Sequence, residues 1–140
     1  MNTSKTSDIF KLTAPYTNPY QGEQPRLLFV CSVGMLRSPT CADVATAAGF
    51  NARSCGSDVT YALIPASYNL IHWADKIICM QQENLNQLLK TFPDLDQLIL
   101  SVTDVWDIRD SYDRNERRLI DIASTKVTEL RYSEEFVDVF

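Results

Sequence analysis

The sequence has few positive charges and no long apolar run. Its 140 residues include 13 Lys and Arg against 18 Asp and Glu, which gives a formal net charge of −5 and a sequence pI of about 4.7. Proteins that bind nucleic acids or acidic membranes usually present a basic face, so we expect neither kind of partner. No apolar stretch approaches the ~20 residues that a membrane span requires. The N-terminal MNTSKTSDIFKL also lacks the apolar core of a signal peptide.

Residues that commonly bind metals are scarce as well. His72 is the single histidine, and the four cysteines at positions 31, 41, 55 and 79 form no CxxC pair and no metal-like spacing. We therefore expect no metal and no other cofactor. In the absence of an export signal, the cysteines are expected to be reduced thiols in a cytoplasmic protein.

The composition predicts one domain preceded by a short extension. Hydrophobic residues make up 45% of the chain, which is ordinary for a globular domain of this length. The first 25 residues are polar, contain three prolines and show no sustained period. We predict a flexible or loosely packed extension over residues 1–25 and a folded domain over residues 26–140.

Apolar runs and helical periods alternate along the rest of the chain. Strands are predicted over residues 26–31, 51–54, 76–80 and 97–102, and helices over residues 39–48, 65–75, 82–92 and 114–130. This alternation is typical of an α/β fold in which helices cover both faces of a parallel sheet. Ligands of such sheets bind beyond the carboxyl ends of the strands. The loop of residues 104–113 and the end of the first strand would therefore share one edge.

The most informative stretch is LLFVCSVGMLRSP, residues 27–39. A buried strand ends at Cys31, five residues follow, and Ser38 and Pro39 are suited to the N-cap and first position of a helix. Backbone N–H groups at a helix start form an anion site, and Arg37 could bind two oxygens of a phosphate. Amides and guanidinium together would stabilise a Cys31 thiolate and make it a nucleophile. Ser38 could instead point its hydroxyl at the Cys31 sulfur, and both roles stay open.

LFVCSVGMLRSPT resembles the phosphate-binding loop of the low-molecular-weight protein tyrosine phosphatases, especially the short bacterial and phage members. The resemblance extends to SCGS (54–57), LIHWADKIICM (70–80) and DIRDSY (107–112), and so covers about residues 26–130. It implies a three-layer sandwich around a four-stranded parallel sheet. It also implies a metal-independent cysteine phosphatase acting on phosphotyrosine proteins or small aryl phosphates through a Cys31 phosphoenzyme. The residues expected to bind phosphate are Ser32, Val33, Gly34, Met35, Leu36, Arg37 and Ser38.

A general acid is needed to protonate the leaving oxygen. The family carries Asp-Pro-Tyr where this chain has Asp110, Ser111 and Tyr112. The resemblance therefore favours Asp110 over Asp107 as the acid. Tyr112 is either a substrate contact at the cleft mouth or a half-exposed core tyrosine.

The chain departs from the family pattern at two loop positions. Gly34 stands where the family usually has Asn, and glycine tolerates the left-handed backbone expected there. Leu36 stands where many members carry a second, protective Cys. Two alternatives stay open at this point: a phosphate-binding or protein-docking module without catalysis, and a thiol-dependent arsenate reductase, for which Cys79 lacks a neighbouring resolving thiol.

Overall fold

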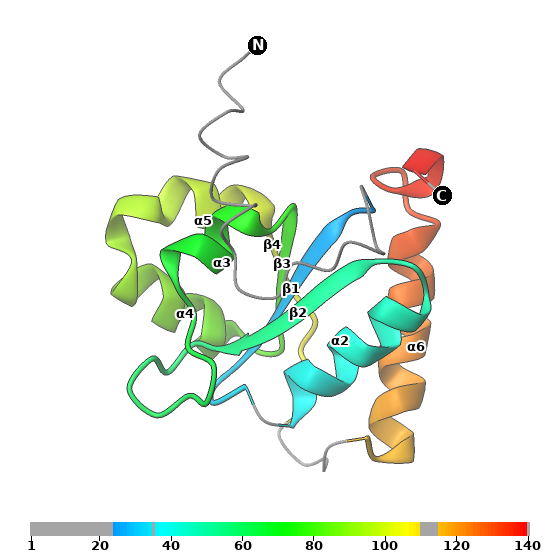
Figure 1. Ribbon diagram of the computed structural model, residues 1–140, viewed down its shortest axis with the longest axis horizontal. Helices are drawn as coiled ribbons and strands as arrows, with labels where there is room; N and C mark the ends of the chain where they lie inside the picture. Colours follow the sequence, from blue (N-terminus) through cyan, green and yellow to red (C-terminus); the bar gives the residue numbers. More distant parts are fainter. Residues whose placement is uncertain (1–23, 35, 110–114, 140) are drawn as a thin grey trace.

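A four-stranded parallel sheet forms the centre of the computed structural model, which describes residues 24–34, 36–109 and 115–139 (Figure 1). The strands are β1 (Arg26–Cys31), β2 (Asn51–Gly56), β3 (Lys76–Cys79) and β4 (Thr103–Val105), in the order β2-β1-β3-β4. Each neighbouring pair runs parallel. The extension predicted over residues 1–25 lies outside the described residues, except for Gln24 and Pro25.

Helices cover both faces of this sheet, as Figure 1 shows. On one face lie α2 (Arg37–Ala47) and α6 (Arg117–Arg131), which pack on each other. On the other lie α3 (Tyr68–Trp73), α4 (Gln82–Thr91) and α5 (Asp96–Val102). Short 3₁₀ helices span Pro93–Leu95 and Val137–Val139. The predicted α/β sandwich with a four-stranded parallel sheet is confirmed.

Strand β1 is apolar throughout because it has helices on both sides. Leu27, Phe29 and Cys31 face the α2 and α6 layer, whereas Leu28 and Val30 face the layer of α3, α4 and α5. All five side chains are buried. A central strand of a parallel sheet is expected to be apolar at every position rather than at alternate ones.

The strand predicted over residues 97–102 is wrong. This apolar run belongs to α5, in which Ile99 is fully buried while the adjacent Leu100 is 58% exposed. The fourth strand comes later, at Thr103–Val105, where no residue is fully buried. A short edge strand needs no apolar run, so its sequence gives little signal.

The N-terminal ends of two helices also differ from the prediction. Helix α2 begins at Arg37, so Ser38 and Pro39 lie inside its first turn, and the N-cap position is Leu36. Helix α3 begins at Tyr68 rather than near residue 65, because the Ser67 hydroxyl accepts a hydrogen bond from the Leu70 N–H and caps the helix.

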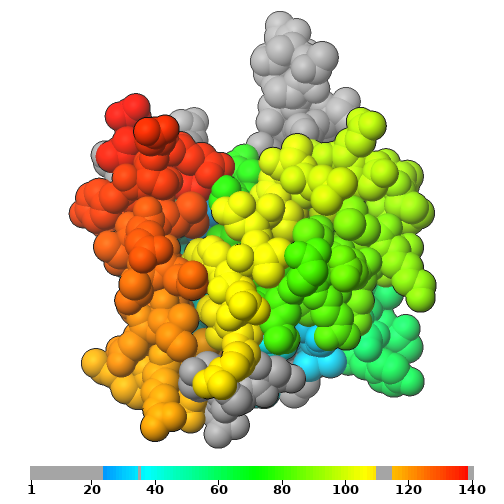
Figure 2. Space-filling model, turned by 180° about the vertical axis from the view of Figure 1, so that it is seen from behind, coloured from blue at the N-terminus to red at the C-terminus, as the bar shows by residue number. Residues whose placement is uncertain are grey.

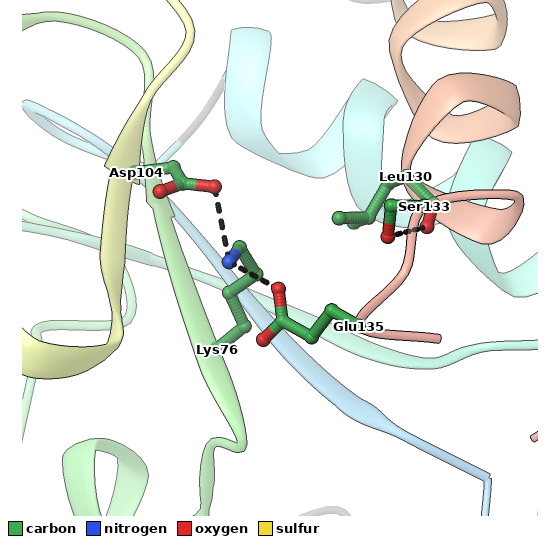
Figure 3. Close-up of polar contacts among 5 residues, drawn as sticks. All are labelled: Lys76, Asp104, Leu130, Ser133 and Glu135. Atoms are coloured by element: carbon green, nitrogen blue, oxygen red, sulfur yellow. Dashed lines mark hydrogen bonds and ion pairs between the residues drawn. The ribbon is translucent and has the colours of Figure 1, made fainter. Parts of the chain in front are cut away.

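The C-terminal segment is bound to the amino-terminal end of the sheet. Lys76 Nζ lies 3.0 Å from Asp104 Oδ2 on β4 and 2.7 Å from Glu135 Oε2. Figure 3 shows the lysine between these two carboxylates. Beside this cluster, the Phe136 and Phe50 rings meet edge to face with centroids 5.7 Å apart. The lysine is thus shared between the sheet and the residues after α6. In the described part of the chain, no helix has both the length and the hydropathy of a membrane span.

Candidate active site

The site lies at the carboxyl end of β1, where the chain leaves the sheet and enters α2. Cys31 is the last strand residue and is 3% exposed. The segment that follows β4 crosses the space between α6 and the α4–α5 layer and extends toward this same end of the molecule (Figure 2). The sheet therefore brings the predicted nucleophile and the described part of the predicted acid loop, residues 106–109, to one edge, as expected for a parallel α/β fold.

Ser38 points its hydroxyl at the predicted nucleophile. The Cys31 Sγ and Ser38 Oγ atoms are 3.0 Å apart, and both residues are buried. Ser38 Oγ also lies 3.5 Å from the Cys55 carbonyl oxygen. Of the two roles considered for Ser38, the structure shows the sulfur contact and no N-cap. A hydroxyl can donate to a thiolate and stabilise it.

Gly34 gives the loop its shape. Its φ is +74°, a left-handed conformation, and a Cβ there would lie 2.9 Å from the Cys55 carbonyl carbon and from the Gly56 nitrogen. Gly56 in turn has no room for a Cβ, which would lie 2.8 Å from the Ser32 oxygen. Both glycines are needed for this close backbone approach.

The segment that follows β2 makes backbone hydrogen bonds to the loop that follows β1. Amides of this segment donate to three consecutive carbonyl oxygens of the loop region. The pairs are Ser57 N with Cys31 O (2.9 Å), Asp58 N with Ser32 O (2.8 Å) and Leu63 N with Val33 O (3.4 Å). These oxygens, which would repel an anion, are thereby engaged by the neighbouring segment. Such an arrangement favours an anion on the amide side of the loop.

Arg37 is buried at the start of α2 and reaches across the sheet edge. It is 3% exposed, and its Nη1 donates to Gln81 Oε1 at 2.8 Å and to the Ile108 carbonyl at 2.9 Å. The contact with Ile108 joins the predicted phosphate-binding loop to the segment that carries the candidate acids. Neither Gln81 nor Ile108 was singled out by the sequence.

Asn84 was also missed by sequence reasoning. It is fully buried in the first turn of α4 and donates to Ser32 Oγ (3.3 Å) and to Ser57 Oγ (3.2 Å). Its Oδ1 accepts from the Gln81 N–H at 2.9 Å, and Ser57 Oγ also bonds to Gln87. A fully buried amide that makes these contacts fixes the position of the loop relative to α4.

The remaining cysteines are unsuited to nucleophilic chemistry. The pKa of Cys41 is raised to about 12, chiefly by burial and also by its proximity to Cys31, while Arg37 acts in the opposite direction. Burial also raises the pKa of Cys79 to about 12, and that of Cys55 still higher. All three stay protonated thiols at neutral pH, and none is in a disulfide.

The acid loop is only partly described. Ile108 N donates to Met80 O at 2.8 Å and Trp106 N to Cys79 O at 2.9 Å, so this segment continues along the end of β3. Asp107 is exposed and has a φ of +57°. Asp110 and Tyr112 lie outside the described residues, as does Met35 of the loop.

The structure is similar to solved phosphatases. These include a low-molecular-weight protein tyrosine phosphatase from Streptococcus pyogenes (TM-score 0.60, 14% identity, 82% of this chain and 98% of that one). They also include the YwlE arginine phosphatase from Geobacillus stearothermophilus (TM-score 0.57, 18% identity, 76% of this chain and 90% of that one). A third is Wzb from Vibrio vulnificus in complex with benzylphosphonate (TM-score 0.58, 15% identity, 76% of this chain and 97% of that one).

Sequence comparison adds no closer relative, since no family model and no curated protein matches the chain. At these identities the similarity concerns the fold, and it extends over nine-tenths or more of each of the three solved chains. The chain therefore has the three-layer fold of the low-molecular-weight protein tyrosine phosphatases.

Proposed function

We propose that this protein is a metal-independent cysteine phosphatase that hydrolyses phosphomonoesters, with protein phosphotyrosine as the substrate class. The observation that carries the proposal is the 3.0 Å contact between Cys31 Sγ and Ser38 Oγ at the carboxyl end of the central strand. Beside it lie the left-handed turn at Gly34 and the buried guanidinium of Arg37. Together they supply a nucleophile, its hydrogen-bond donor and a cation for the transferred group.

In the first step the Cys31 thiolate attacks phosphorus. The S–P bond forms while the bond between phosphorus and the leaving oxygen breaks, and Asp110 gives its proton to that oxygen. Loop amides and Arg37 stabilise the charge on the equatorial oxygens. In the second step water attacks phosphorus and gives a proton to the Asp110 carboxylate. The S–P bond breaks, and the products are inorganic phosphate and the regenerated thiolate.

The burial of the other three thiols favours phosphatase activity over arsenate reduction. A reductase needs a second thiol that can attack a bond formed at Cys31. Cys41, Cys55 and Cys79 are all buried with raised pKa values, so they are poorly suited to that step. We also propose that the protein acts in a reducing compartment, such as the cytoplasm, because the mechanism needs Cys31 as a free thiol.

The direct test is phosphate release by the purified full chain in the presence of EDTA. We expect hydrolysis of p-nitrophenyl phosphate and of phosphotyrosine peptides. Because one similar structure is described as an arginine phosphatase, phosphoarginine peptides form the comparison substrate. Faster release from phosphoarginine would contradict the substrate class. Phosphate binding without release from any of these substrates would favour the docking module instead.

A further inference from the structure

Gln81 lies outside the expected motif, and its side chain contacts Arg37 directly. It lies after β3, at the N-cap of α4, on the same sheet edge as Cys31. Its backbone is held from both directions, because its N–H donates to Asn84 Oδ1 (2.9 Å) and its carbonyl accepts from Asn84 N (3.0 Å). The Gln81 side chain therefore extends from a fixed point toward Arg37.

This contact pairs a buried arginine with an uncharged side chain. Arg37 Nη1 donates to Gln81 Oε1 and to the Ile108 carbonyl, and neither of these two acceptors is charged. A buried guanidinium requires hydrogen-bond acceptors, and a carboxylate would be the stronger one. A carboxylate at this position would also add a negative charge, which repels an anion. The amide orients the guanidinium without adding that charge.

We propose that Gln81 is a positioning residue for Arg37: it fixes the guanidinium beside the phosphate-binding loop through a neutral acceptor, which adds no negative charge next to the bound phosphoryl group. The proposal deepens the proposed function and rests on it. Gln81 does not touch the reacting atoms, and it acts through Arg37.

Two substitutions at this position separate charge from orientation. Gln81→Glu keeps the length and the acceptor but adds a negative charge beside Arg37. It should weaken inorganic phosphate binding and raise KM for p-nitrophenyl phosphate by about tenfold or more, because ground state and transition state are both anionic. Gln81→Leu keeps the bulk but removes the acceptor. It should lower kcat by about tenfold with a smaller change in KM, because the guanidinium loses its orientation.

Gln82→Glu is the matched control. Gln82 is the next residue, is exposed, and bonds only to Asn86 among the described residues. The Gln82→Glu substitution adds the same negative charge at the same end of α4, but at a side chain that does not contact Arg37. We expect its phosphate affinity, KM and kcat to stay within about threefold of wild type. Thermal unfolding of all variants shows whether each one folds. If Gln81→Leu does not fold, Gln81→Glu still tests the inference.

The measurements are calorimetric titration with inorganic phosphate and steady-state kinetics on the full chain. If Gln81→Glu binds phosphate as the wild type or as Gln82→Glu does, the inference is overturned. If the wild type binds phosphate without turnover and Gln81→Glu loses that binding, the proposed function fails and the role of Gln81 at the anion site stands. A wild type that does not bind phosphate overturns both.

Discussion

Gly34 and Gly56 lie where two backbone segments approach so closely that neither residue has room for a Cβ. A Cβ on Gly34 would lie 2.9 Å from the Gly56 nitrogen, and one on Gly56 would clash with the Ala62 Cβ and lie 2.8 Å from the Val33 carbonyl carbon. At this point the predicted phosphate-binding loop meets the end of β2. The close approach and the positive φ require glycine at position 34, where the family resemblance led us to expect asparagine.

Replacing Gly34 with alanine should damage both the loop and the fold. The substituted residue would keep a φ near +74° and clash with backbone atoms that cannot move easily, at a cost of about 1–3 kcal/mol. We expect a lower melting temperature together with weakened binding of inorganic phosphate. Gly49→Ala is the control, since Gly49 also has positive φ (+101°) but follows α2 far from the loop. It should lower stability and leave phosphate binding intact, and equal losses of binding in both variants would contradict this account.

Removing the Ser38 hydroxyl should make Cys31 less reactive. Hydrogen bonds to charged groups contribute about 1.5–3 kcal/mol, so Ser38→Ala should slow alkylation of Cys31 by iodoacetamide at neutral pH by about tenfold. Thr40→Val removes another hydroxyl of α2, one that bonds to the Leu36 carbonyl instead of to sulfur. Its alkylation rate should stay close to wild type. An unchanged rate in Ser38→Ala would show that the 3.0 Å contact does not stabilise a thiolate.

The two candidate acids can be distinguished by the leaving group. Asp110→Asn should slow hydrolysis strongly for aryl phosphates with basic leaving groups and weakly for those with acidic ones, because only a basic oxygen needs the proton. Asp107→Asn should cause a modest loss that does not depend on the leaving group. The measurement is kcat/KM across aryl phosphates of graded phenol pKa. A steep dependence in Asp107→Asn with none in Asp110→Asn would reverse the assignment.

The Lys76 cluster predicts a stability that declines at high pH. Burial lowers the pKa of Lys76, but hydrogen bonds to Glu135 and Asp104 outweigh that effect and raise it above its usual value. A raised pKa in the folded state stabilises the protein below the lysine's unfolded pKa of ~10.4 and ceases to do so as the pH rises through the folded value.

Lys76→Met should therefore lower the free energy of unfolding by about 1 kcal/mol at pH 7, and the difference from wild type should shrink above pH ~10.4. Urea denaturation between pH 7 and 11 measures this difference in the free energy of unfolding. Arg117→Gln, which removes an exposed pair with Asp121, is the control and should cost no more than about 0.5 kcal/mol. A Lys76→Met difference that grows with pH would refute the cluster's role.

The sequence predicted those elements correctly in which the spacing of apolar residues matches the positions that are buried in the structure. The apolar run of β1 and the helical period of α6 both appear in the structure. The run at residues 97–102 misled us because a short helix with one buried position, Ile99, resembles a buried strand when only hydrophobicity is considered. β4 was missed since a short edge strand carries polar residues such as Asp104.

For the candidate site, the local motif placed Cys31 and Ser38 together because both lie within one strand, loop and helix. Gln81, Asn84 and Ile108 contact the loop from positions 44 to 71 residues away from their partners, and no local pattern encodes such contacts. One signal was available: polar residues at positions 81–84 directly follow a buried strand of the same sheet. Since strand ends meet at one edge, those residues could have been considered for the site.

Trapping of a covalent intermediate tests the central claim most directly. The full chain is mixed with p-nitrophenyl phosphate in EDTA, quenched within milliseconds and digested, and its peptides are examined by mass spectrometry. The account predicts a phosphoryl group on Cys31 in the wild type and in Cys41→Ser, a buried-thiol control, with neither the adduct nor turnover in Cys31→Ser. Comparable turnover in Cys31→Ser, or the phosphoryl group on another residue, would contradict a Cys31 phosphoenzyme.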